Sequence, residues 1–178
     1  MAGHPDMPDM ADMAAMARPD AAALLPRARG IARLDGREAR MEAFAALWWD
    51  AFAAHGTSWA GFYVDVPGEP DDRRMVLAAR RPKPACSPIG IHGACGQSLV
   101  AARTLVVRDV AELGAGYIAC DPRDRSELVV PCLDASGHAW GVFDVDSHEV
   151  ANFDRRDADC CAALLVAAGL SAHAPDLR

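Results

Sequence analysis

Three cysteines and three acidic residues that are suited to chemistry fall between residues 86 and 146. They are Cys86, Cys95, Cys120, Glu127, Asp144 and Asp146. The cysteines lie in or beside segments that contain glycine or proline, where solvent and a second thiol can reach them. In a chain with no signal for an oxidising compartment, thiols beside carboxylates indicate redox chemistry on a small charged molecule.

Asp144 and Asp146 stand two residues apart in a predicted strand, so their side chains project to the same face, and Glu127 begins the neighbouring strand. Acids on a mostly apolar strand are costly to bury unless a cation or a metal ion meets them. The alternative is a solvated face near the strand end, and the pattern alone does not decide between the two. Trp59 and Tyr63 likewise fit either a core or the wall of a ligand site.

The other cysteines, Cys132, Cys160 and Cys161, lie inside apolar segments and are most simply small core residues. A zinc site is a weaker alternative to redox use of the loop thiols. It would combine Cys86, His92 and Cys95, but this spacing lacks a C-x-x-C pair. We therefore expect no bound metal or cofactor.

The composition limits the class of partner. The chain has 178 residues, enough for one domain with a full core, and carries a formal charge of −7 with a pI near 5.3. Because its Lys and Arg residues form no basic run, nucleic acid and anionic membrane are disfavoured and a small molecule is favoured. No basic segment precedes an apolar run and the six cysteines are irregularly spaced, so we expect a cytoplasmic protein with reduced thiols.

Periodicity and turn signals predict the elements that must position these residues. Residues 1–25 are rich in Met, Ala, Asp and Pro and predict a disordered tail before a domain at 26–174. A capping box at Asp35 and Glu38 predicts the start of a helix that ends at Gly56.

Further along the chain, strands are predicted at 59–66, 75–79, 104–108, 128–133 and 139–145, with helices at 94–103 and from Asp154 to Gly169. The irregular segment 109–124 is long for a loop, which is typical of lids and binding segments. The order predicts an α+β domain with a central antiparallel sheet and helices packed on one face.

Six short motifs in this part of the chain occur in a recognisable order. They are Trp59-Ala-Gly-Phe62-Tyr63, Pro84-Ala-Cys86, Gly93-Ala-Cys95-Gly, Gly116-Tyr-Ile-Ala-Cys120-Asp, Ser126-Glu127-Leu-Val-Val-Pro and Gly141-Val-Phe-Asp144-Val-Asp146-Ser. Together they resemble the free methionine-(R)-sulfoxide reductases, which are single GAF domains. Three thiols combined with one Glu and an Asp-x-Asp pair separate this family from GAF domains that only bind ligands.

The resemblance implies thiol-dependent reduction of free L-methionine-(R)-sulfoxide to methionine. Cys120 matches the family's reactive cysteine, Cys86 the resolving cysteine, and Cys95 a third thiol that joins disulfide exchange. The implied path runs through a sulfenic acid on Cys120 and an intramolecular disulfide, which an external dithiol such as thioredoxin reduces.

The resemblance also implies a substrate site. Glu127, Asp144 and Asp146 match the acids that hold the ammonium group of the substrate and assist at the sulfoxide oxygen. Trp59 and Tyr63 match the aromatic wall of the family's substrate pocket. Loop amides near Ile118 and Ala119 are candidates for binding the substrate carboxylate.

Two departures from the family pattern leave questions open. Tyr117 stands where the family usually has His, and the loop from Cys86 to Cys95 is one residue shorter than usual. Either Cys86 or Cys95 is therefore a candidate for the first partner of Cys120. The rival classes are a GAF sensor that binds a small molecule without turnover and a metal-binding regulatory domain that uses His92. Family members are often homodimers, which no feature of this sequence indicates.

Overall fold

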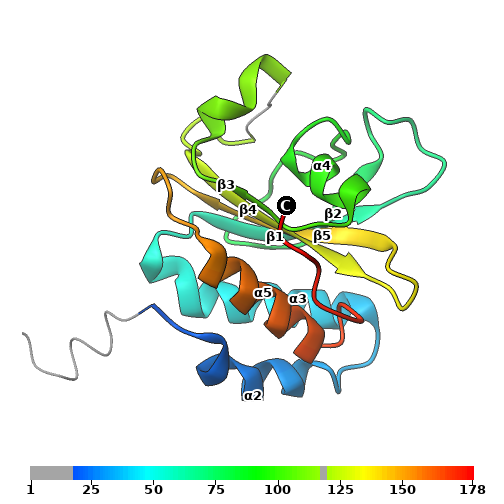
Figure 1. The fold of residues 1–178 in the computed structure, drawn as a ribbon. Coiled ribbons are helices and arrows are strands. Elements are labelled where there is room, and N and C mark those ends of the chain that lie inside the picture. The colour runs from blue at the N-terminus through cyan, green and yellow to red at the C-terminus, as the bar shows by residue number, and fades with distance from the viewer. Residues whose placement is uncertain (1–17, 117–119) are drawn as a thin grey trace, which may run out of the picture.

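A five-stranded antiparallel sheet forms the centre of the computed structural model, which describes residues 18–116 and 120–178 (Figure 1). The spatial order of its strands is β2-β1-β5-β4-β3. The strands are β1 Trp59–Asp65, β2 Met75–Arg81, β3 Leu105–Val107, β4 Ser126–Leu133 and β5 Ala139–Ser147. The helices are α2 Ala21–Ile31, α3 Arg37–Phe52, α4 Ala94–Ala101 and α5 Arg155–Ala167, with the 3₁₀ segments η1 Ala53–His55 and η2 Val110–Gly116.

Strands β4 and β5 form the predicted hairpin. Gly137 in the turn has a φ of 88°, which glycine adopts without strain. The side chain of Asp134 accepts a hydrogen bond from the backbone N–H of His138 at 3.0 Å and so fixes the turn. The turn sets the register of the hairpin, which places Glu127 directly opposite Asp146.

Helices α2, α3 and α5 cover one face of the sheet (Figure 1). The strand residues on this face include Phe62 and Phe143, whose rings meet Phe44 of α3 at centroid distances of 5.8 and 4.9 Å. Trp48 of α3 also packs edge-on against Phe143, at 5.7 Å. All four side chains are fully buried, so this face carries the main apolar core.

The opposite face of the sheet carries α4 and the loops around it (Figure 1). Leu99 of α4 packs there with Val129 of β4 in a second, smaller apolar cluster. Gly96 has no room for a side chain, because a Cβ would lie 2.1 Å from the Cα of Ile91. This close approach packs the first turn of α4, which carries Cys95, directly against the loop that precedes the helix.

The predicted α+β class and the central antiparallel sheet are confirmed, and the two longer predicted helices, α3 and α5, lie on one face as expected. The short helix α4 is the exception, on the other face. Helix α2 is an addition to the predicted elements. It begins at Ala21, within the segment whose composition predicts a tail, continues through Pro26 and buries Leu24. Within the described ranges, no helix combines the length and apolar character that crossing a bilayer requires.

The predicted capping box at Asp35 and Glu38 is wrong. Helix α3 begins at Arg37 after Gly36, whose φ is 81° and which has no side chain to cap the helix. Because the turn after α2 places Gly36 at the cap position, Asp35 lies one residue too early to bond to the amides of the first turn. At the other end of the chain, Asp154 caps α5 as predicted.

Candidate active site

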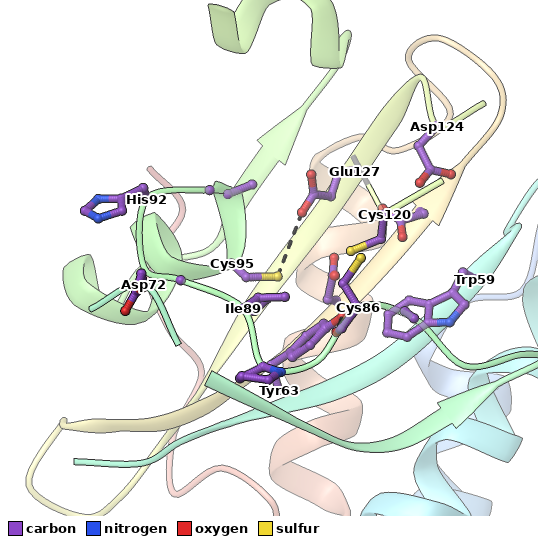
Figure 2. Close-up of a pocket in the computed structure, with 17 residues that line it drawn as sticks. Trp59, Tyr63, Asp72, Cys86, Ile89, His92, Cys95, Cys120, Asp124 and Glu127 are labelled. Carbon is purple, nitrogen blue, oxygen red and sulfur yellow. Dashed lines mark hydrogen bonds between the residues drawn. The ribbon is translucent and has the colours of Figure 1, made fainter. Parts of the chain in front are cut away.

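A cavity of about 320 Å³ lies on the face of the sheet that carries α4 (Figure 2). Every predicted site residue within the described ranges lines it: Trp59, Tyr63, Cys86, Cys95, Cys120, Glu127, Asp144 and Asp146. The other predicted residues, Ile118 and Ala119, and also Tyr117, lie outside the described residues. The volume falls within the range of small-molecule sites, roughly 300–1,000 Å³.

The three acids come from the central strands. Glu127 on β4 pairs with Asp146 on β5, and Asp144 follows on the same face; their exposed fractions are only 4, 9 and 6 %. Burial raises the pKa of Asp144 to about 7. Burial, together with the charges of Asp144 and Glu127, raises the pKa of Asp146 well above its usual range. Near neutral pH this cluster holds protons that it can donate to an oxygen, and an incoming cation favours their release.

Cys95 lies with the acids rather than with the other loop thiols. Its thiol donates to Oε1 of Glu127 at 4.0 Å and also hydrogen-bonds with Asp144 (Figure 2). Burial, followed by the charge of Asp144, raises the pKa of Cys95 well above its usual range. The thiol is therefore protonated and enclosed, which makes it a poor nucleophile.

Cys86 and Cys120 are both exposed, and their sulfur atoms lie side by side in Figure 2. The Cys120 thiol itself is partly enclosed, and this partial burial, followed by its hydrogen bond with the Cys86 side chain, raises the pKa of Cys120 to about 12. The negative charge of Asp144 acts in the same direction. Cys120 is thus a thiol, in contact with the Cys86 thiol and near the buried acids.

The aromatic wall also holds the loop that carries Cys86. Trp59 and Tyr63 lie on the same face of β1, with ring centroids 6.1 Å apart. The indole Nε1–H of Trp59 donates to the carbonyl of Lys83 at 2.9 Å, and the hydroxyl of Tyr63 donates to the carbonyl of Cys86 at 2.8 Å. Gly61 between them leaves room for the indole, because a Cβ there would lie 2.4 Å from Cη2 of Trp59.

The structure adds lining residues that the sequence did not single out, among them Asp72, Ile89 and Asp124. Asp124 is buried, and burial followed by the charge of Asp121 raises its pKa. Asp124 stands two residues before β4, and an acid just before a strand that carries site residues was the sequence feature that could have identified it. Asp72 and Ile89 come from loops whose paths the sequence does not specify.

The weaker zinc alternative is not assembled as predicted. His92 lines the cavity, but it is not part of either group of ligand atoms that lie within 4.8 Å of one another among the described residues. One group is formed by Cys95, Glu127 and Asp144, and the other by Asp121, Asp124 and His148. The first group is the one that could hold a thiophilic metal ion, and it is the floor of the cavity itself.

Comparison with known proteins identifies the family. No protein-family model matches the chain. The crystal structure of free methionine-R-sulfoxide reductase from Neisseria meningitidis, in complex with its substrate, is 30 % identical in sequence and covers 96 % of this chain and 97 % of its own, with a TM-score of 0.69. The chain belongs to the free methionine-R-sulfoxide reductase family. Its GAF fold is confirmed by a solved GAF-domain structure that is 28 % identical and superposes with a TM-score of 0.72 over 85 % of this chain and 89 % of its own.

Two further comparisons support this conclusion, one with a named member of the family and one with a solved structure of the GAF fold. Free methionine-R-sulfoxide reductase from Saccharomyces cerevisiae is 35 % identical over 118 residues, which are 65 % of this chain and 64 % of the yeast protein. The alignment thus spans slightly less than two thirds of that relative. A putative GAF sensor protein from Burkholderia vietnamiensis is 35 % identical, with a TM-score of 0.73 over 83 % of this chain and 90 % of its own.

Proposed function

We propose that this member of the free methionine-R-sulfoxide reductase family reduces free L-methionine-(R)-sulfoxide to methionine. The observation that carries the proposal is the pair of touching thiols, Cys120 and Cys86, above buried acids that hold protons near neutral pH. A thiol pair supplies two electrons, and a protonated carboxyl supplies the acid that a sulfoxide oxygen needs when it leaves sulfur.

Recognition of a free amino acid follows from the charges in the cavity. The acids Glu127, Asp144 and Asp146 offer an ionic site to an ammonium group, and binding it compensates for their burial. Oδ1 of Asp144 is buried and accepts no hydrogen bond from the described residues, so it is available to a ligand. The thioether side chain of the substrate would pack against Trp59 and Tyr63. Binding of the substrate carboxylate by amides near residues 118–119 stays a prediction.

In the first chemical step, the sulfur of Cys120 attacks the sulfoxide sulfur and a buried carboxyl protonates the sulfoxide oxygen. The oxygen passes to Cys120 as a sulfenic acid and methionine leaves with a reduced sulfur. The proton lost by the Cys120 thiol returns the carboxyl to its starting state. An ammonium group bound at the acids reduces the negative field that otherwise opposes the Cys120 thiolate.

In the second step, the thiol of Cys86 attacks the sulfenic acid, a disulfide forms and water leaves. Cys86 is the candidate partner because its side chain contacts Cys120, whereas Cys95 is enclosed by Glu127 and Asp144. An external dithiol of the thioredoxin type then reduces the disulfide to two thiols.

The test couples turnover to NADPH through thioredoxin and thioredoxin reductase. Free R and S epimers of methionine sulfoxide and a peptide-bound sulfoxide are compared, in the wild type, in Cys120→Ser and in the matched control Cys132→Ala, whose thiol lies in the core on the other face of the sheet. We expect turnover of the free R epimer by the wild type and the control alone. Binding without turnover in the wild type would instead identify a sensor module.

A further inference from the structure

An ion pair joins the two loops that carry the thiols. Nζ of Lys83 lies 2.6 Å from Oδ2 of Asp121. Lys83 is three residues before Cys86, and Asp121 directly follows Cys120. We propose that this ion pair positions the resolving thiol against the reactive thiol, so that Lys83 and Asp121 govern how fast the disulfide forms. The inference rests on the proposed thiol chemistry and adds two positioning residues to it.

The Lys83 side of the pair is held from several directions. Pro82 and Pro84 flank Lys83 and restrict its backbone. Its carbonyl accepts the hydrogen bond from the indole of Trp59, on the wall of the cavity. Lys83 is also the only lysine in the sequence, and every other residue of the Lys and Arg type is an arginine. A compact ammonium group, rather than a broad guanidinium, therefore occupies the position between the loops.

The Asp121 side is fixed on its own loop. Arg123 donates to Asp121 through Nη2 at 2.7 Å and Nε at 3.0 Å, and its backbone N–H donates at 3.1 Å. Nε2 of His148 lies 3.9 Å away. The hydrogen bonds from Arg123, followed by the one from Lys83, hold the pKa of Asp121 well below its usual range. Asp121 is thus a fixed anion, and Lys83 is the member that brings the other loop to it.

Disulfide formation requires the attacking sulfur to approach along one direction, so holding two loops together raises the effective concentration of one thiol at the other. Tyr63 fixes the backbone of the Cys86 loop to the sheet through the Cys86 carbonyl. The Lys83 ion pair adds the only side-chain salt bridge, among the described residues, that runs from this loop to the segment after Cys120. Its loss should leave the loop in place but let the two sulfurs separate.

The experiment is a single turnover followed by mass spectrometry. Reduced protein is mixed with free methionine-(R)-sulfoxide in rapid-quench mode, with dimedone in the quench to trap sulfenic acid. In Lys83→Met we expect methionine to be released at the wild-type rate, the Cys120 sulfenic acid to accumulate, and the disulfide to form about tenfold more slowly. Lys83→Arg keeps the charge but not the compact shape, and should recover only part of the rate. The matched control is Arg81→Met, which removes a neighbouring ion pair to Glu42 at 3.1 Å.

Further readouts separate positioning from a general loss of structure. Asp121→Asn should slow the disulfide to a similar extent, and the double variant should be no slower than either single variant, because both act through one contact. The equilibrium constant for disulfide formation against dithiothreitol should fall about tenfold in Lys83→Met, which is about 30 mV for two electrons. High salt should slow the wild type toward the variant.

A wild-type rate of disulfide formation in Lys83→Met would overturn the proposal, as would an equal slowing in Arg81→Met. If the wild type does not turn over the sulfoxide at all, the proposed substrate is wrong, but the ion pair is still tested. One equivalent of hydrogen peroxide then replaces the sulfoxide, converting the Cys120 thiolate to the sulfenic acid with release of hydroxide, and the second step is timed as before. Failure of the function and failure of the ion-pair role are thus distinguishable.

Discussion

Phe143 and Asp144 are neighbours on β5 and lie on opposite faces of the sheet. Phe143 is fully buried against the rings of Phe44 and Trp48 on α3. Asp144 is nearly as buried, yet it faces a cavity, and its Oδ1 is without a hydrogen-bond partner among the described residues. One face is filled by side chains and stabilises the fold, whereas the other buries acids at the expense of stability and leaves them available to a ligand.

The largest expected effect is on the filled face. We predict that Phe143→Ala lowers the free energy of unfolding by about 3–5 kcal/mol, because it leaves a void inside the aromatic cluster. Urea denaturation followed by tryptophan fluorescence measures the loss, and Phe143→Leu should give a smaller loss of the same kind. The value of kcat/KM of the folded protein should stay within about twofold of wild type, so a specific loss of catalysis would contradict the separation of the two faces.

On the open face, the matched change is Asp144→Asn. We predict a fall in kcat/KM for the free R epimer of about 100-fold, or about 2.7 kcal/mol, because the substrate loses an ionic partner in a buried site. The exposed Glu149 provides the control, and Glu149→Gln should leave kcat/KM unchanged. A change of less than threefold in Asp144→Asn would show that the acid face does not recognise the substrate.

The same variant gives a pH signature in stability. The pKa of Asp144 is raised to about 7 in the folded protein, so between about pH 4 and pH 7 the folded state binds a proton that the unfolded chain has lost. The contribution of Asp144 to stability is therefore present below the unfolded pKa and declines as pH rises toward 7. We predict that the stability of Asp144→Asn relative to wild type increases with pH in this window, by at most about 1.4 kcal/mol per pH unit. Urea denaturation at four pH values measures it, and a flat difference would contradict the assigned burial.

The smallest expected effect concerns the boundary between the two faces, at the aromatic wall. In Gly61→Ala the new methyl group meets the indole of Trp59 at 2.4 Å and the backbone oxygen of Ala79 at 2.9 Å, so both the indole and the edge of β2 must shift. We predict a roughly fivefold increase in KM, equivalent to about 1 kcal/mol, with kcat little changed. Steady-state kinetics with the free R epimer measures the two constants. An unchanged KM would show that the indole does not contact the substrate.

The sequence was most informative where the period of a strand decides the outcome. Alternation along β5 was enough to place Asp144 and Asp146 on one face, and the turn at Gly137 was enough to predict the hairpin. Helix starts were less reliable, because a capping residue is recognised only when the preceding turn is known. Asp154 satisfied the rule, whereas Asp35 failed because Gly36 occupies the cap position of α3.

The grouping of the thiols could not be predicted for a different reason. Cys86 lies in the loop between β2 and α4, and Cys95 lies in the first turn of α4, so the sequence leaves both as candidate partners of Cys120. Long-range hydrogen bonds give the two thiols different environments. The Tyr63 hydroxyl donates to the carbonyl of Cys86, and the Cys95 thiol donates to the carboxylate of Glu127. These contacts depend on the path of one loop over the sheet, which local propensity does not encode.

The central claim is that the thiol pair and the acids beneath it act on one small molecule. Reduced protein given a single equivalent of free methionine-(R)-sulfoxide, with no external reductant, tests this most directly. We predict one methionine released per chain and one new disulfide, mapped by proteolysis and mass spectrometry to Cys86 and Cys120, with Cys95 still a free thiol. Unchanged sulfoxide, or a first disulfide that contains Cys95, would contradict the account.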